Sequence, residues 1–190
     1  MANRVKATRE DIISAAVKIV RQRGKDALNA RSLAKALNCS IQPIYYQFGT
    51  MKNLRDAVRK EIKSIYNAHI GKLKTRTDAV HFRDVGVEYL MFAYKEPNYF
   101  EALFMDRQNN SFSVEDAADE NLDYIVSVIR KDFELTKKEA VKIIEISWLT
   151  IHGLAVMIIS GYMKPNSEKI KQIMTDTFYG QIALIKNNNK

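Results

Sequence analysis

Cysteine, glycine and proline are all scarce in this sequence, and each scarcity excludes a class of protein. One cysteine, Cys39, occurs in 190 residues, so no internal disulfide can form and a secreted disulfide scaffold is excluded. Seven glycines and three prolines are too few for an all-β chain with many tight turns, or for a disordered chain. The apolar residues, 46% of the total, can build a sizeable core in one compact domain or two small ones.

Neither the N-terminus nor the long uncharged run near the C-terminus predicts a membrane protein. Charged residues interrupt the apolar stretch of residues 1–20, so we expect no signal peptide and a cytoplasmic protein. Residues 146–163 carry no formally charged side chain and approach the lower length limit for a membrane span. Because several polar residues interrupt this run, we interpret it as a buried helix of a bundle or of an oligomer interface.

Positive charge is concentrated in the first part of the chain. The net formal charge is +8, but residues 1–75 hold 16 Lys and Arg against 5 Asp and Glu, a net charge of +11, and residues 76–190 have a net charge of −3. This difference in net charge indicates that only the N-terminal part binds a polyanion, with nucleic acid as the first candidate. A solvated basic surface without a partner and a membrane lipid surface are the alternatives that charge alone leaves open.

Apolar residues recur every three or four positions along nearly the whole chain, and this spacing predicts an all-α fold. The helices expected in the first part cover residues 9–23, 30–37, 41–48, and 51 to between 69 and 74. The helices expected later cover residues 78–95, 97–106, 115–133, 137–163 and 167–186. The expected N-caps are Thr8, Asn29, Ser40 and Thr50.

The first three helices are short, and a three-residue turn joins the second to the third, which describes a helix-turn-helix. In this motif the third helix enters the DNA major groove and presents its N-terminal residues to base edges. Ile44 and Phe48 are four residues apart and are expected to point back at the first helix. We therefore predict a DNA-binding domain over residues 1–54 and a second helical domain over residues 55–190.

The other positions of this third helix form an outer arc rich in tyrosine and glutamine. They are Ile41, Gln42, Pro43, Tyr45, Tyr46 and Gln47. Glutamine can bond N6 and N7 of adenine, and a proline ring can contact a thymine methyl group. Tyrosine hydroxyls and the helix N-terminus at Thr50 suit phosphate oxygens. The alternative for Tyr45 and Tyr46 is that they pack between helices.

From Thr8 to Leu54 the chain resembles the TetR family of bacterial transcription regulators. The residues that carry this resemblance are the capped first helix, Leu33-Ala34, the turn closing in Cys39-Ser40, and Ile44-Tyr45-Tyr46-Gln47-Phe48. Two later segments match more loosely. They are Phe92 to Phe100, which looks like a junction between two helices of the family, and Trp148 to Gly153, which is similar to a Trp…His-Gly motif of one branch.

The resemblance implies a dimeric regulator that binds a double-stranded DNA operator through its N-terminal helices and a small effector through its C-terminal helices. The implied base contacts are Ile41, Gln42 and Pro43, and the implied backbone contacts are Tyr45, Tyr46, Thr50 and Arg31. Where many members have a phosphate-binding lysine this chain has Met51, so Lys52 is the candidate substitute. Asn38 replaces a common glycine and tolerates the left-handed conformation that the turn needs.

The second domain offers candidates for an effector pocket and for a dimer interface. Large or polar residues inside otherwise apolar helices are the pocket candidates, and such a lining suits a lipophilic or aromatic effector. They are Tyr89, Phe92, Phe104, Tyr124, Trp148 and His152. A stripe in the last helix is the candidate interface of a two-fold homodimer. It consists of Ile170, Ile173, Met174, Phe178 and Ile182. Core packing is the alternative for both sets.

An enzyme and a helical adaptor are the alternatives to a DNA-binding regulator. The sequence has no Gly-rich phosphate loop, no Gly-x-Ser-x-Gly segment and no His/Cys set with metal-ligand spacing, so we expect no catalysis, no cofactor and no metal. An adaptor would keep the helix-turn-helix fold without binding DNA. We predict a dimeric, ligand-responsive DNA-binding regulator, and the resemblance implies a repressor, the most frequent role in such families.

Overall fold

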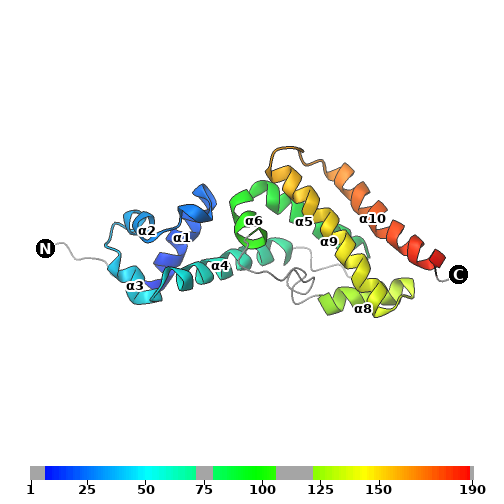
Figure 1. The fold of residues 1–190 in the computed structure, drawn as a ribbon, viewed down its shortest axis with the longest axis horizontal. Coiled ribbons are helices and arrows are strands. Elements are labelled where there is room, and N and C mark those ends of the chain that lie inside the picture. The colour runs from blue at the N-terminus through cyan, green and yellow to red at the C-terminus, as the bar shows by residue number, and fades with distance from the viewer. Residues whose placement is uncertain (1–6, 72–78, 106–121, 189–190) are drawn as a thin grey trace. The chain divides into compact units, whose positions relative to one another are not determined.

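The computed structural model describes residues 7–71, 79–105 and 122–188, and every regular element in these ranges is a helix (Figure 1). The helices are α1 Arg9–Arg23, a 3-10 turn Lys25–Ala27, α2 Ala30–Ala36, α3 Gln42–Phe48, α4 Met51–Gly71, α5 Ala79–Lys95, α6 Pro97–Phe104, α8 Leu122–Phe133, α9 Lys137–Ile159 and α10 Ser167–Asn188. The predicted all-α class is confirmed. Of the expected helix at residues 115–133, the part before residue 122 lies outside the described ranges.

Local hydrogen bonds fix the starts of three N-terminal helices. Thr8 Oγ1 accepts the backbone N–H of Asp11 at 3.1 Å, and the Asp11 carboxylate accepts the N–H of Thr8 at 3.0 Å, which is a capping box in front of α1. Asn29 and Ser32 form the same reciprocal arrangement before α2. Thr50 Oγ1 accepts a backbone N–H from the first turn of α4 at 3.1 Å. These three predicted caps are confirmed.

The expected cap of α3 at Ser40 is wrong. The helix begins at Gln42 with Ile41 as its N-cap, and no side chain caps it. Pro43 lies in the first turn, as predicted, and its missing N–H leaves one donor fewer for a cap to satisfy. The helix ends where expected, at Gly49, whose φ of 70° lies in the left-handed region that glycine adopts without strain.

The turn before α3 takes the backbone conformation that the sequence predicts. Asn38 has a φ of 51°, a left-handed conformation that asparagine tolerates better than most residues. The chain therefore makes this tight turn without a glycine.

The chain packs into two compact units. The first comprises residues 1–68 and 96–107, and the second comprises residues 69–95 and 108–190. Helix α6 therefore packs with α1 to α4 although α5 precedes it in the sequence. The functional boundary predicted between residues 54 and 55 lies inside α4, and it stays a prediction because packing units and functional domains need not coincide.

The core of the first unit contains apolar side chains from each of its α-helices. Ile44 and Phe48 of α3 are 1% and 5% exposed, so their predicted inward orientation is confirmed. Helix α1 contacts both α2 and α6. The other large, fully buried side chains of this core are Ile12, Leu28, Leu33, Leu54, Ile62 and Phe100. This packing holds the short α3 in a fixed place within the first unit.

In the second unit α9 is the central helix, because it contacts α5, α8 and α10. Helix α10 lies beside it and runs in the opposite direction (Figure 1). Among the described helices, α9 is the one that is long and apolar enough to cross a membrane. Its buried residues recur every three or four positions and so lie on one side of the helix, as expected for a helix that packs in a bundle.

The stripe of α10 that was expected to meet a second subunit is buried within the chain itself. Its members Ile170, Met174, Phe178 and Ile182 are between 1% and 6% exposed. Phe178 and Ile182 belong to one apolar cluster with residues of α8 and α9. A side chain buried within its own chain has no surface left for a partner. These four residues therefore pack in the core of their own chain. Ile173, the fifth, is half-buried.

Candidate nucleic-acid interface and effector site

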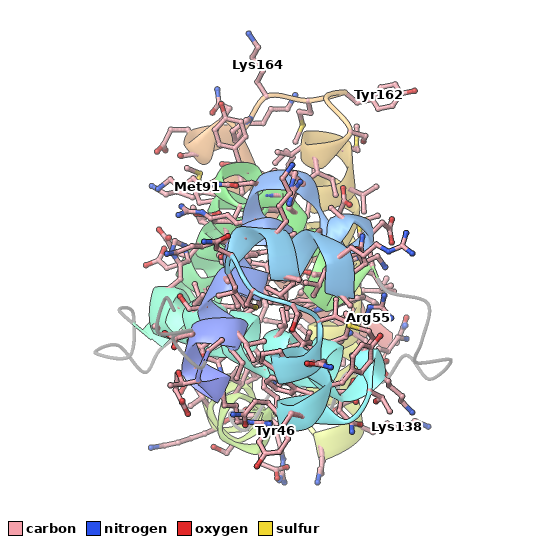
Figure 2. All side chains as sticks on the ribbon, turned by 90° about the vertical axis from the view of Figure 1, so that its left-hand side faces the viewer. Tyr46, Arg55, Met91, Lys138, Tyr162 and Lys164 are labelled. Carbon is pink, nitrogen blue, oxygen red and sulfur yellow. The ribbon has the colours of Figure 1, made fainter. Side chains whose placement is uncertain are left out.

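Helix α3 presents its outer arc to solvent. Tyr46 is 88% exposed and its ring points away from the helix (Figure 2). Tyr45 and Ile41 are 43% and 44% exposed, Gln42 is exposed, and Pro43 is half-buried. Tyr46 therefore does not pack between helices, and Tyr45 does so only in part. The arc combines hydrogen-bonding and apolar groups, which is the mixture that base edges and phosphates require.

The remaining predicted DNA contacts lie at the starts of two neighbouring helices. Arg31 is exposed in the first turn of α2, and Thr50 and Lys52 are exposed at the start of α4. The first N–H groups of a helix and its dipole favour anions. Cationic and hydroxyl side chains at these positions are therefore suited to bind phosphate oxygens.

Two side chains that the sequence analysis did not single out hold the C-terminal end of α3. Arg9 Nη1 donates to the carbonyl oxygen of Gln47 at 3.0 Å. Asn53 Nδ2 donates to the carbonyl oxygen of Phe48 at 2.8 Å. Arg9 follows a cap and Asn53 lies in the first turn of a helix, and neither position carries a sequence signal for such a contact.

A cluster of aromatic and polar side chains joins α5 to α9 in the second unit. The Tyr89 hydroxyl lies 2.9 Å from His152 Nδ1. The Trp148 ring stacks on the His152 imidazole, with centroids 4.6 Å apart and an interplanar angle of 10°. Beside Trp148, Ser147 is fully buried, and its hydroxyl has no hydrogen-bond partner within the part of the chain that the structure describes. The cluster thus offers an aromatic face and polar groups in a mostly apolar setting.

Comparison with known protein families matches both parts of the chain. Residues 12–58 match the model of the tetR family of bacterial regulatory proteins. Residues 82–178, just over half of the chain, match the model of the tetracyclin repressor-like C-terminal domain. The chain belongs to the TetR family. It is therefore a DNA-binding transcriptional regulator and not an enzyme.

Solved structures of TetR-family regulators share the fold. A TetR-like transcriptional regulator from Rhodococcus sp. RHA1 is 14% identical, with a TM-score of 0.66 over 96% of this chain and 98% of that chain. TetR from Acinetobacter baumannii AYE is also 14% identical, with a TM-score of 0.62 over 95% of this chain and 97% of that chain. No curated protein matches this chain. At this identity the likeness establishes the architecture, and the roles of individual residues rest on their own contacts.

In this TetR-family chain, three of the six predicted effector residues come together. Tyr89, Trp148 and His152 form the cluster described above. Phe92 lies one turn after Tyr89 in α5, is 2% exposed, and has its ring centroid 5.6 Å from that of His69. Core packing accounts for Phe92, since a side chain this deeply buried has little surface for a ligand.

The other two predicted effector residues are not placed at this cluster. Phe104 lies in α6, which belongs to the first unit, and its ring contacts those of Tyr66 and Phe100 at centroid distances of 5.2 and 5.0 Å. The side chain of Tyr124 lies outside the described residues. The periodicity that selected these residues shows that a position is apolar, but it does not show which helices meet there.

Because the His152 imidazole is half-buried, we expect acid to destabilise the second unit. Burial lowers the pKa of His152 below its ordinary value of 6.5. As the pH falls below 6.5, the unfolded chain takes up a proton at this residue while the folded chain resists it, so the free energy of unfolding falls with the pH. Urea unfolding at about pH 7.5 and about pH 5.5 should show a smaller decrease for His152→Gln than for the unsubstituted protein. An equal decrease in both proteins would contradict this assignment.

Proposed function

We propose that this protein is a ligand-responsive repressor that binds a pseudo-palindromic DNA operator as a homodimer in the cytoplasm. The observation that carries the DNA-binding part is the outward-facing arc of α3, in which Tyr46 is 88% exposed. In this proposal α3 lies in the major groove. Ile41, Gln42 and Pro43 contact base edges, and Tyr45, Tyr46, Thr50, Lys52 and Arg31 bind the DNA backbone.

The dimer is proposed to form through the solvent-facing sides of α9 and α10. Leu149 and Met157 of α9 are 57% and 45% exposed, and Leu184 of α10 is 54% exposed. Leu149, Gly153 and Met157 follow one another at four-residue spacing, so they share one face of α9. A second copy of the chain would bury this face and complete a four-helix bundle about a two-fold axis.

Two glycines support close packing of a partner helix in this region. Gly153 in α9 and Gly180 in α10 have open space where a Cβ atom would lie. Nothing in the described part of the chain itself therefore requires a glycine there for space. Glycine inside a helix costs about 1 kcal/mol relative to alanine. Glycine lets the backbones of two helices approach closely, so tight packing against a partner helix would offset this cost.

The two-fold axis of such a dimer sets the form of the operator. It relates the two copies of α3, so the DNA half-sites are inverted repeats of each other. Their centres should lie about 34–36 Å apart, one turn of the double helix, or a multiple of that distance. Duplexes selected from a random pool by the purified protein should therefore contain an inverted repeat. Failure to enrich any duplex at low ionic strength would favour the adaptor alternative and overturn the proposal.

The effector is proposed to bind beside Tyr89, Trp148 and His152. The indole ring of Trp148 supplies a stacking surface, and the half-buried His152 imidazole supplies a polar anchor. Because burial lowers the pKa of His152, the imidazole is neutral near pH 7 and adds no positive charge for an anion. These properties suit an uncharged lipophilic or aromatic compound with one or two hydrogen-bonding groups.

Helix α6 provides the proposed link between effector and DNA. At its start, Arg21 Nε of α1 donates to the Glu96 carboxylate at 2.8 Å, and Asn98 Nδ2 donates to the carbonyl oxygen of Arg21 at 2.8 Å. At its end, Arg59 of α4 donates to the carbonyl oxygen of Leu103 at 2.8 Å. Helix α6 is thus attached at both ends to the unit that carries α3.

The link to the effector cluster is covalent and short. Glu96 directly follows the last residue of α5, the helix that carries Tyr89. A shift of α5 on effector binding would move α6, and with it α1 and α4. The two copies of α3 would then no longer match the half-site spacing. Operator affinity would fall by the factor by which the effector binds the shifted conformation more tightly than the DNA-binding conformation.

The single tryptophan of the chain makes this effector site testable by fluorescence. An aromatic or lipophilic compound that releases the selected duplex should change the emission of Trp148, because the indole forms part of the proposed site. His152→Gln should weaken binding of that compound by about tenfold, the loss expected for one hydrogen bond to a buried group. Tyr162→Phe, on an 86% exposed side chain, is the matched control. Release of DNA with unchanged emission and unchanged affinity in His152→Gln would place the effector elsewhere.

A further inference from the structure

The C-terminal end of α3 is held by side chains, whereas its N-terminal end is not. The helix has seven residues and no side-chain cap at its start. A helix of this length is not stable alone, so its direction depends on contacts with its neighbours. The apolar contacts come from Ile44 and Phe48, which are 1% and 5% exposed. The polar contacts come from α1 and α4.

Arg9 contacts two consecutive residues at the end of α3. Its Nη1 donates to the carbonyl oxygen of Gln47 at 3.0 Å, and its guanidinium carbon lies 4.2 Å from the centroid of the Phe48 ring. The carbonyl of Gln47 belongs to the last turn of the helix, where carbonyls have no partner within the helix. A planar guanidinium can make the hydrogen bond and the stacking contact at the same time, which a lysine ammonium cannot do.

Arg9 is itself fixed in place by the start of α1. It is the first residue of that helix and lies within the capping box that Thr8 and Asp11 form. From the other side, Asn53 in α4 donates to the carbonyl oxygen of Phe48 at 2.8 Å. Two helices on which α3 rests therefore hold consecutive carbonyls at one end of it.

The residues proposed to read bases lie at the opposite end of α3. Gln42 is its first residue and Gln47 is one residue before its last. Seven residues span about 10 Å, so a tilt of about 6° around the held end moves the N-terminal residues by about 1 Å. A displacement of that size is enough to disrupt a bidentate hydrogen bond to a base.

We infer that Arg9 is a positioning residue for DNA reading: it sets the angle of α3 through the Gln47 carbonyl and the Phe48 ring, without contacting DNA itself. This inference rests on the proposed function of α3. It distinguishes Arg9, which is itself exposed, from Arg31 and Lys52, the cations proposed to bind phosphates. Positioning affects the recognition of sequence, whereas phosphate contacts affect the binding of every sequence.

The test compares Arg9→Lys and Arg9→Gln with the unsubstituted protein on two DNA probes. The probes are a duplex selected from a random pool by the unsubstituted protein and a scrambled duplex of the same length and composition. Both variants should lose about tenfold in affinity for the selected duplex and less than about twofold for the scrambled one. The salt dependence of binding to the scrambled duplex should not change. Lys18→Gln, which removes an exposed charge from the same helix, is the control and should keep the affinity ratio of the two probes.

Three outcomes would overturn the inference. Equal losses on both probes for Arg9→Gln, with a salt slope smaller by about 0.9 for each lost contact, would make Arg9 a phosphate ligand. Full affinity of Arg9→Lys for the selected duplex would mean that a positive charge at this position is sufficient and that the guanidinium geometry is not needed. A lower melting temperature with an unchanged affinity ratio would make the role purely structural. If the unsubstituted protein selects no duplex, the proposed function fails, and that result is distinct from these three.

Discussion

Replacing Gln42 and Tyr45 together by alanine should abolish operator binding while leaving the fold and the dimer intact. Gln42 is proposed to contact a base and Tyr45 a phosphate, and a dimer loses both contacts in each half-site. A good base contact is worth about 1–3 kcal/mol, so the combined loss should be at least about a hundredfold in affinity. Gln42 is exposed and Tyr45 is 43% exposed, so the free energy of unfolding should fall by less than about 0.5 kcal/mol for Gln42→Ala and by about 1 kcal/mol for Tyr45→Ala.

Fluorescence anisotropy with the selected duplex and sedimentation velocity of the free protein measure these two properties. The matched control is Gln22→Ala with Tyr162→Ala, which removes exposed residues of the same types outside α3. The control should bind the duplex as the unsubstituted protein does. An adaptor that does not use DNA would show no difference between the two double variants. Retained operator affinity in Gln42→Ala/Tyr45→Ala would remove α3 from the interface.

The second large effect is expected at the proposed dimer face. Leu149→Glu with Leu184→Glu places a carboxylate on each of two side chains that are more than half exposed in the single chain. The chain itself should fold normally, because neither side chain is part of its core. In a dimer these carboxylates would lose water without a partner charge, which costs several kcal/mol for each. We therefore expect a monomer at micromolar concentration.

Loss of the dimer should weaken operator binding without altering α3. A monomer occupies one half-site at a time and loses the high effective concentration that links two half-sites, so affinity should fall by about 10²-fold or more. Tyr94→Glu, on a 54% exposed side chain of α5, is the control and should stay dimeric. A double variant that remains a dimer by sedimentation equilibrium would show that the subunits meet through a different surface.

Local features of the N-terminal helices could be predicted from the sequence because they depend on residues only a few positions apart. Thr8 and Asn29 cap their helices through partners three residues away. Asn38 adopts a left-handed conformation that its own side chain tolerates. The predicted cap at Ser40 is wrong because α3 begins one residue later than the sequence indicates, with Pro43 in its first turn.

Contacts between distant segments could not be predicted in this way. Glu96 and Arg21 are 75 residues apart, and no periodic pattern indicates that α6 packs on α1. The stripe around Phe178 was the most apolar face of α10, but such a face is buried first within its own chain. The side proposed to meet a partner is marked instead by exposed Leu184 and by Gly180, a weaker signal that becomes visible only once the core is known.

The central claim is that two copies of α3 enter the major groove of one operator, and methylation interference on the selected duplex tests it most directly. Methyl groups on guanine N7 lie in the major groove, and those on adenine N3 lie in the minor groove. We predict that N7 methylation blocks binding at two clusters of positions related by the inverted repeat, with centres about 10 base pairs or a multiple apart. Interference confined to the minor groove, or binding that tolerates every N7 methylation, would contradict the claim.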